Sequence, residues 1–234
     1  GGAIYNYSFV VTAGSSSVNY TITRSYFTKN QGTYGGAIYN ECFVNGLSGS
    51  ATCTSTITES NFTENTATYG GAIINRCVLS LVGTLDSAAC TSTINNSNFI
   101  NNTATNDGGA IYNECLVLDG SAAVTCTVTE SNFTDNTATY GGAIRNYNYV
   151  NGGVGSVNCT ANFSRFHNNT ATIYGNAIYN EGGSVDATLN WWGSNEHPSS
   201  QLYGSNIVYD PWIVLRTSAD PDSIYNGQTS TVTV

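Results

Sequence analysis

The sequence is poor in charge and in most of the residues that carry chemistry. Charged residues make up only 9% of the 234 positions, against roughly 25% in an average globular protein. The net charge is −9, and Lys29 is the single lysine among six basic residues. Phosphate and anionic lipid surfaces are bound by clustered lysine and arginine. We therefore expect neither a nucleic-acid partner nor an anionic membrane partner.

Methionine is absent, and no positively charged leader followed by an apolar run is present. This predicts a processed product or a fragment of a longer chain. The longest apolar runs are only a few residues long, so we expect no membrane insertion.

What the sequence has instead is a repeat. The words Gly-Gly-Ala-Ile, or Gly-Asn-Ala-Ile in the last copy, begin at residues 1, 35, 70, 108, 141 and 175. A second word, Phe-x-x-Asn, precedes each copy after the first, at residues 27–30, 62–65, 99–102, 133–136 and 166–169. Two words that keep a fixed phase over five periods indicate a repeat architecture.

Each repeat reads as a short strand, a Gly/Ser-rich loop, a Thr-rich alternating strand and a polar turn. Such units cannot bury a face alone and must stack, with about 4.8 Å between neighbours. We therefore predict an all-β, right-handed parallel β-helix of about five to six turns. Its repeats would span residues 1–189, with an aromatic and proline-rich cap at 190–216 and a terminal strand at 217–234.

Stacking turns equivalent positions into columns. The invariant isoleucines would lie in the core, and the phenylalanines would form a stacked aromatic column. The asparagines two positions after each isoleucine would pass side-chain hydrogen bonds along the axis. The position between them is Tyr39, Ile74, Tyr112, Arg145 or Tyr179 in successive turns. It tolerates an arginine, so we expect it to face outward.

The paired words resemble the repeats of polymorphic outer-membrane proteins and of the adhesin-like surface proteins of methanogenic archaea. The ending, with its "NWWGSNEHPSS" and "VYDPWIVL" segments, is similar to the close of the archaeal β-helices. The resemblance covers essentially the whole chain. It implies a right-handed parallel β-helix at the cell surface and a role in adhesion. In the archaeal group an immunoglobulin-like domain often follows, which the terminal "STVTV" would start.

A second interpretation of that terminal strand is assembly. It could complete the open first turn of another copy of the chain, and a head-to-tail contact of this kind builds filaments. The expected partners are therefore other copies of the chain or glycans on neighbouring cells.

Six of the seven cysteines flank the loops of three repeats, and this spacing predicts disulfides within each repeat. The pairs would be Cys42–Cys53, Cys77–Cys90 and Cys115–Cys126. Buried free thiols and bonds between turns are the alternatives, because connectivity cannot be read from sequence. Cys159 is left over, since Asn148 stands at its partner position. No zinc spacing is present, and we expect no metal or cofactor.

Nine Asn-x-Ser/Thr sequons predict glycosylation, and with the cysteines they predict an extracellular location. The asparagines are Asn6, Asn19, Asn61, Asn95, Asn101, Asn132, Asn158, Asn162 and Asn168.

β-Helices also include polysaccharide lyases and hydrolases, which need closely placed carboxylates. Here the acidic residues follow the repeat, with Arg76 between Glu41 and Glu114 on neighbouring turns, and this indicates ion pairs between turns. We therefore expect a non-enzymatic protein and assign no catalytic residue; a polysaccharide-binding or polysaccharide-degrading enzyme is the alternative. A row of exposed Tyr39, Tyr112 and Tyr179 would be a glycan-stacking face. The alternative is that these tyrosines stabilise the sheet or pack under a loop.

Overall fold

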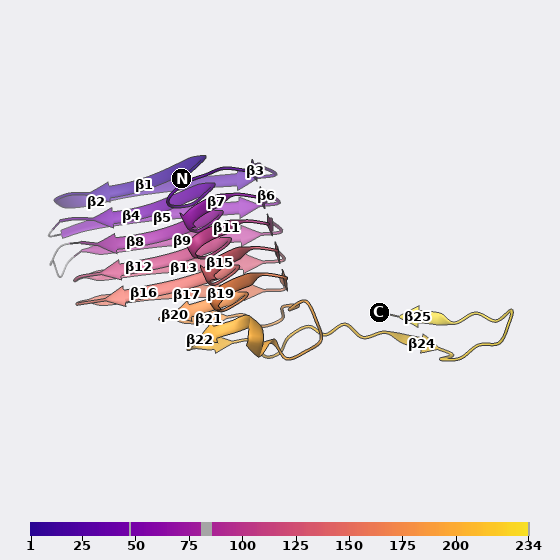
Figure 1. Cartoon of the computed structure of the whole chain (residues 1–234). Coiled ribbons are helices and arrows are strands. Elements are labelled where there is room, and N and C mark those ends of the chain that lie inside the picture. The colour runs from indigo at the N-terminus through magenta and orange to yellow at the C-terminus, as the bar shows by residue number, and fades with distance from the viewer. Residues whose placement is uncertain (47, 81–85, 234) are drawn as a thin grey trace.

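Strands from successive repeats pair side by side in parallel, so the chain forms a β-solenoid of about five turns (Figure 1). The computed structural model describes residues 1–46, 48–80 and 86–233. Within this part, the predicted parallel all-β architecture is confirmed. The one helical segment described is a short 3₁₀ helix, η1 (Pro198–Gln201). No helix among these residues is long and apolar enough to cross a membrane.

Two seven-stranded sheets form the broad walls of the solenoid. Sheet A contains β1 (Ile4–Val10), β4 (Ile38–Val44), β8 (Ile73–Leu79), β12 (Ile111–Val117), β16 (Ile144–Val150), β20 (Ile178–Glu181) and β22 (Leu202–Gly204). Sheet B contains β2 (Ala13–Thr23), β5 (Ser48–Thr58), β9 (Ser87–Asn95), β13 (Ser121–Thr129), β17 (Val154–Asn162), β21 (Ser184–Asp186) and β23 (Ile207–Val208).

Two narrower sheets complete each turn, where the sequence predicted only a polar turn. Sheet C contains β3 (Tyr26–Thr28), β6 (Asn61–Thr63), β10 (Asn98–Ile100), β14 (Asn132–Thr134) and β18 (Arg165–His167). Sheet D contains β7 (Thr66–Tyr69), β11 (Thr103–Asp107), β15 (Thr137–Tyr140) and β19 (Thr170–Tyr174). These short strands persist because the turns above and below supply their hydrogen-bond partners.

Left-handed residues make the corners between the walls. The residue two positions before each sheet C strand and the residue directly after it have positive φ, as at Asn96 (46°) and Asn101 (54°) around β10. At the corner between sheets D and A, Gly108 has a φ of 62°. Its neighbour Gly109 lies against the next turn, because a Cβ there would sit 2.0 Å from the Gly142 carbonyl oxygen. The Gly-Gly pair is therefore required by backbone shape and by close approach.

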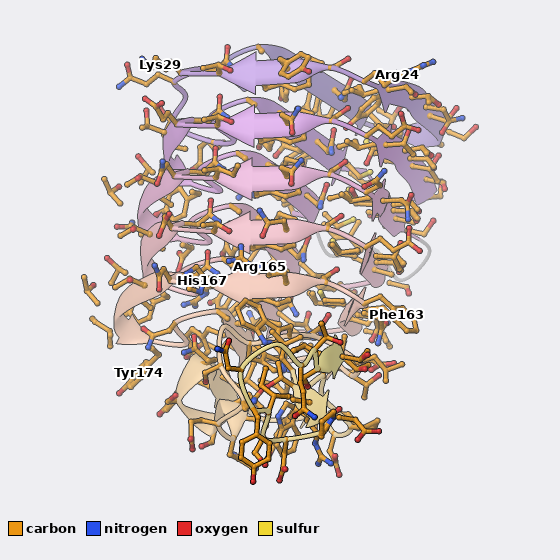
Figure 2. The ribbon with its side chains drawn as sticks, turned by 90° about the vertical axis from the view of Figure 1, so that its right-hand side faces the viewer. Arg24, Lys29, Phe163, Arg165, His167 and Tyr174 are labelled. Atoms are coloured by element: carbon orange, nitrogen blue, oxygen red, sulfur yellow. The ribbon has the colours of Figure 1, made fainter. Side chains whose placement is uncertain are left out.

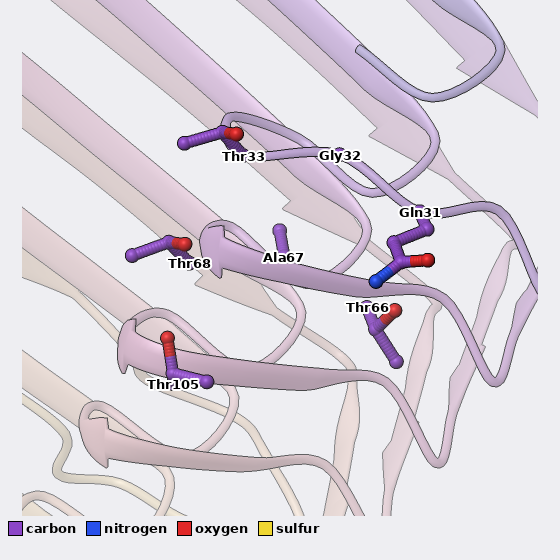
Figure 3. Close-up of a pocket in the computed structure, with 7 residues that line it drawn as sticks. All are labelled: Gln31, Gly32, Thr33, Thr66, Ala67, Thr68 and Thr105. Atoms are coloured by element: carbon purple, nitrogen blue, oxygen red, sulfur yellow. The ribbon is translucent and has the colours of Figure 1, made fainter.

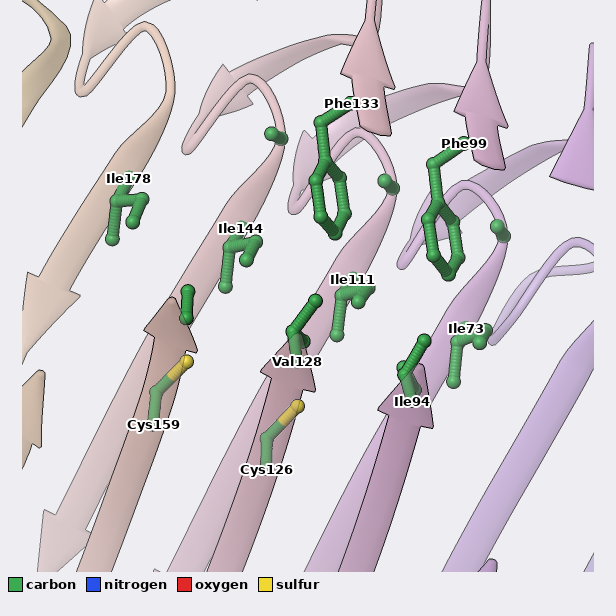
Figure 4. Packing of buried hydrophobic residues seen from close by; sticks show 14 of the residues in the cluster. Ile73, Ile94, Phe99, Ile111, Cys126, Val128, Phe133, Ile144, Cys159 and Ile178 are labelled. Carbon is green, nitrogen blue, oxygen red and sulfur yellow. The ribbon is translucent and has the colours of Figure 1, made fainter. Parts of the chain in front are cut away.

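The repeated side chains stack in register. The isoleucines that open the sheet A strands, from Ile38 to Ile178, are fully buried, which confirms the predicted core column. Phenylalanines of sheet C stack with ring centroids 4.8–4.9 Å apart, from Phe27 to Phe166. Trp192 continues this column at 4.9 Å from Phe166. Figure 4 shows the isoleucine and phenylalanine columns facing the same core.

Two asparagine ladders run along the axis. The predicted one, which begins at Asn6 and Asn40, is confirmed, with amide hydrogen bonds of 2.9–3.3 Å between successive turns. The second uses the asparagines of the Phe-x-x-Asn words, such as Asn102. In that residue Oδ1 accepts from the backbone N–H and side chain of Asn65, while Nδ2 donates to Asn136 and to the Phe62 carbonyl. Buried polar atoms at these corners are therefore satisfied by their own copies in adjacent turns.

The end of the described chain leaves the solenoid as an arm (Figure 1). Its strands β24 (Ser218–Asp220) and β25 (Thr231–Thr233) pair antiparallel with each other. The terminal strand thus has a local partner that the sequence did not reveal. Val234 of the "STVTV" segment lies outside the described residues. The domain boundaries at 189 and 216 stay predictions.

Truncation of a column phenylalanine should strongly destabilise the fold. Phe99 is fully buried between two parallel rings, so Phe99→Ala should lower the free energy of unfolding by about 3–5 kcal/mol. Phe163→Ala is the matched control, because Phe163 is 58% exposed, and should change it by less than about 0.5 kcal/mol. Denaturant unfolding followed by circular dichroism measures both. Equal losses of unfolding free energy in the two variants would contradict a stabilising role of the aromatic column.

Removal of one ladder asparagine should be costly because it leaves several buried partners unpaired. Asn102→Ala deprives the Asn65 N–H groups and the Phe62 carbonyl of their partner, and we expect a loss of about 2–4 kcal/mol in unfolding free energy. Asn106→Ala, on the exposed side of β11, should be near neutral. The same unfolding assay decides, and a neutral Asn102→Ala would show that the ladder does not contribute to stability.

Candidate functional site

The outward column of sheet A is covered by a second layer of tyrosines. In most turns a tyrosine precedes the glycine corner: Tyr34, Tyr69, Tyr140 and Tyr174. The corner folds these rings back over the sheet, so that Tyr34 stacks on Tyr39 at 5.4 Å and Tyr69 packs on Tyr112 at 6.0 Å. The side chains of the column point away from the core, as predicted, but they do not all reach solvent.

The predicted exposed row of tyrosines is therefore wrong for two of its three members. Tyr39 is 7% exposed and Tyr112 is 3% exposed, while Tyr179 is half-buried. Burial raises the pKa of Tyr112 far above its ordinary value, and the nearby Glu114 charge adds to the increase. Alternation along a strand gives the direction of a side chain but says nothing about what a later loop places over it.

The covering layer is incomplete where Asp107 takes the place of a tyrosine, and a groove of about 460 Å³ opens there. We call it the tyrosine groove. It is lined by Tyr69, Asp107, Tyr112, Glu114, Tyr140, Arg145, Tyr147, Tyr174, Tyr179 and Glu181. Six aromatic rings, three carboxylates and one guanidinium thus surround a single space.

Arg145 organises the groove. Its guanidinium lies over the rings of Tyr179, Tyr140 and Tyr147 at 4.4, 4.8 and 5.5 Å. It donates to Glu181 through Nη2, and its Nη1 lies 3.0 Å from Asp107 Oδ1. Only 6% of the residue is exposed. A buried arginine needs compensating negative charge and aromatic faces, and the groove supplies both.

The groove raises the pKa of the Asp107 carboxyl. It stands where other turns have tyrosine, and the ladder register shifts at this point. Its Oδ1 contacts Arg145 without an aligned hydrogen bond. Burial raises the pKa of Asp107 to about 6, because it outweighs Arg145, which acts in the opposite direction; Glu114 and Glu181 raise it further.

The predicted ion pairs between turns form. Arg76 contacts Glu41 and Glu114, and Glu114 also accepts from Tyr112. The tyrosine layer leaves the Arg76 side chain only 20% exposed. Two further pairs, Arg24–Glu59 and Lys29–Glu64, lie at exposed corners. Figure 2 shows Arg24 and Lys29 on opposite sides of the first sheet C strand.

A second groove, of about 510 Å³, lies on sheet D (Figure 3). It is lined by Gln31, Gly32, Thr33, Thr66, Ala67, Thr68 and Thr105. Its lining contains hydroxyl, methyl and amide groups but no aromatic ring and no charge. It therefore offers fewer means of recognition than the tyrosine groove.

The two histidines belong to the framework. His167 stacks near Trp191 at 5.9 Å, beside Arg165, which donates to Asn132 and Thr134 (Figure 2). His197 caps η1 by accepting from the Ser199 N–H. Among the described residues, no three His, Cys, Asp or Glu side chains are placed to hold a metal ion.

All seven cysteines are buried and free in this structure. Cys42, Cys77 and Cys115 stack in register in sheet A, as do Cys53 and Cys90 in sheet B. The next residue in the sheet B column is Val124, however, and Cys126 lies two residues further along β13. Cys115 and Cys126 belong to different core clusters, so the structure does not bring together this predicted pair. The bonds Cys42–Cys53 and Cys77–Cys90 stay predictions.

None of the nine sequon asparagines is fully buried. The exposed ones are Asn19, Asn101, Asn158 and Asn168, and the partly buried ones are Asn6, Asn61, Asn95, Asn132 and Asn162. The side-chain amides of Asn6, Asn95 and Asn162 donate to Asn40, Thr129 and Thr188 of the neighbouring turns. Asn101 and Asn168 occupy equivalent left-handed corners with φ of 54° and 52°. The four exposed sites are the most accessible for glycosylation, which stays a prediction.

Sequence reasoning missed Asp107, Arg145 and the covering tyrosines as parts of one site. The available signal was the tyrosine that precedes the glycine corner in most turns, and its replacement by Asp107 in one. That pattern acquires meaning only when the corner is known to fold back over sheet A.

A family model described as the Chlamydia polymorphic membrane protein (Chlamydia_PMP) repeat matches residues 24–41 and 96–114. Both segments run from a sheet C corner into the Gly-Gly-Ala-Ile strand. Together with the β-solenoid, they fit repeats of the polymorphic-membrane-protein type. Comparisons with curated proteins and with solved structures found no match.

The raised pKa of Asp107 should make stability depend on pH. A carboxyl that binds its proton more tightly in the folded than in the unfolded state lowers the unfolding free energy as pH rises from about 4 through about 6. Asp107→Asn should remove this decline. Unfolding curves measured from pH 4 to pH 7.5 test it, with Asp135→Asn, an exposed corner residue, as control. A wild-type slope in Asp107→Asn would contradict the assignment.

Proposed function

We propose that the chain is part of a non-enzymatic, adhesin-like protein of the cell surface, and that the tyrosine groove binds saccharides. The observation that carries the proposal is the groove itself, which combines one exposed ring, Tyr174, and four partly exposed tyrosine rings with several polar groups in one concave space. The match to polymorphic membrane protein repeats supports a surface location. The cysteines and the accessible sequons support an extracellular, oxidising location for the protein.

Two exposed tyrosine rings offer a stacking surface at the groove. Tyr174 is 40% exposed and stacks on Tyr203 at 4.0 Å, and Tyr203 is 46% exposed. This pair forms an open aromatic platform at one edge of the groove. Tyr179, against which both rings pack, fixes its orientation. A planar ligand face such as a sugar ring can lie on such a platform.

The charges of the groove select the ligand. Three carboxylates and one guanidinium give a formal charge of −2 at neutral pH. This favours neutral or amine-bearing sugars and disfavours uronic acids, because like charges repel across a partly desolvated site.

The same carboxylates are engaged by the protein's own donors. Glu114 accepts from Tyr112 and Arg76, and Glu181 accepts from Arg145. A glycosidase needs a pair of carboxylates free to reach the scissile bond. The arrangement therefore favours binding over hydrolysis, and we assign no catalytic residue.

Filament assembly through the terminal strand stays a prediction, as does the likeness to archaeal adhesin-like proteins. Strand β25 pairs with β24 in this structure, so donation to another copy requires this small ribbon to open.

Truncation of the platform should weaken saccharide binding. Wild type should bind neutral and amine-bearing oligosaccharides on a glycan array more strongly than uronic acid polymers, and Tyr174→Ala should weaken the strongest of these by at least about tenfold, or about 1.4 kcal/mol. Tyr26→Ala is the matched control, since Tyr26 is 79% exposed on sheet C, outside the groove. Titration calorimetry with the same oligosaccharides gives the affinities. Preference for uronic acids, equal binding by Tyr174→Ala, or no binding to any neutral or amino glycan would contradict the proposal.

A further inference from the structure

Two buried thiols face each other across neighbouring turns. Cys126 of β13 and Cys159 of β17 are direct register partners, and both side chains point into the core. They are 0% and 3% exposed. Figure 4 shows the two sulfur atoms on the same side of adjacent strands. From the sequence Cys159 had no partner, because one was expected within the same repeat, where Asn148 occupies the equivalent sheet A position.

Cys115 has different surroundings. In register its neighbours are Cys77 on one side and Asn148 on the other. The sulfur atoms of Cys42 and Cys77 each donate to a sheet B carbonyl of the following turn, at Ala89 and Ala123. The equivalent position for Cys115 is Ser156. Burial raises the pKa of the Cys115 thiol, and a hydrogen bond to the Ser156 backbone opposes this rise. Cys115 therefore follows the pattern of its own column and does not approach Cys126.

The strand spacing permits a covalent bond between the register partners. Adjacent strands lie about 4.8 Å apart, within the range of about 4.4–6.8 Å that the Cα atoms of a disulfide span. Both side chains leave their strands in the same direction, so their sulfur atoms need only rotate toward each other.

We propose that Cys126 and Cys159 form a disulfide between turns, and that Cys115 is the unpaired thiol of the chain. The bond would fix β17 to β13 and close a loop of one full turn. It would thus join the last complete turns of the solenoid covalently, next to the stack that ends at Trp192.

The chemistry sets when the bond forms. Oxidation requires an external disulfide, such as oxidised glutathione or a disulfide oxidoreductase. One protein thiolate attacks it and releases a thiolate; the second protein thiolate then displaces the other half, so two protein thiols become one disulfide and the external disulfide becomes two thiols. Contact with Cys159 and burial raise the pKa of Cys126 well above its ordinary value, and a thiol reacts only as thiolate. The bond therefore has to form before sheets A and B close.

Oxidative refolding tests the proposal. The full chain, made reduced in a host that adds no glycans, is unfolded in denaturant and refolded with oxidised and reduced glutathione. Remaining thiols are alkylated in denaturant, and the protein is digested without reduction. Cleavage after Arg and after acidic residues places Cys115 in fragment 115–119, Cys126 in 120–130 and Cys159 in 146–165. We expect 120–130 linked to 146–165, with Cys115 alkylated.

Two variants assign the bond. Cys115→Ser should leave the linked fragments unchanged and remove one alkylated site. Cys126→Val, which introduces the residue found at neighbouring core positions such as Val128, should abolish the link and leave Cys159 alkylated. Folded reduced protein exposed to oxidised glutathione should acquire the bond at least tenfold more slowly than refolding protein. An alkylated Cys159 in refolded wild type, or its linkage to any other cysteine, would overturn the proposal.

Discussion

The in-register hydrogen bond between identical amides is the interaction on which the rest of this structure depends. A solenoid turn has corners, and corners expose backbone groups that no strand can satisfy. Here Asn102 and its equivalents bind the backbone N–H and side chain of the asparagine in one neighbouring turn, and the carbonyl of the phenylalanine three residues before that asparagine. Each turn therefore needs the next, and the ladders act together with the backbone hydrogen bonds of the sheets to hold the register in which the phenylalanine and isoleucine columns pack.

Strict repetition builds the rod, and departures from it build the site. Where the repeat would place tyrosines, one turn has Asp107 and the next has Arg145. These two substitutions face each other across neighbouring turns and open the tyrosine layer into a groove. A perfect repeat would present the same small surface at every turn. The irregular turns present one larger surface with charge, aromatic rings and concave shape.

The tyrosine layer also buries charged side chains that lie outside the hydrophobic core. Arg76 and Arg145 lie outside the core, yet both are largely covered. They are held by carboxylates from adjacent turns and by aromatic faces, an arrangement that aligns turns as the asparagine ladders do. Asp107, whose pKa is raised, lies where the contact between carboxylate and arginine lacks an aligned hydrogen bond.

The sequence by itself determined the parallel solenoid, the isoleucine, asparagine and phenylalanine columns, and the ion pairs of Arg76, because stacking makes equal positions in the repeat equal positions in space. It could not determine what lies over a column or which of two inward positions a cysteine takes. The cover on Tyr39 and Tyr112 comes from a corner that reverses the chain, and the partner of Cys159 depends on a two-residue offset between Cys90 and Cys126. Only the tertiary structure decides these, because they depend on contacts between different columns, whereas the repeat specifies contacts within one.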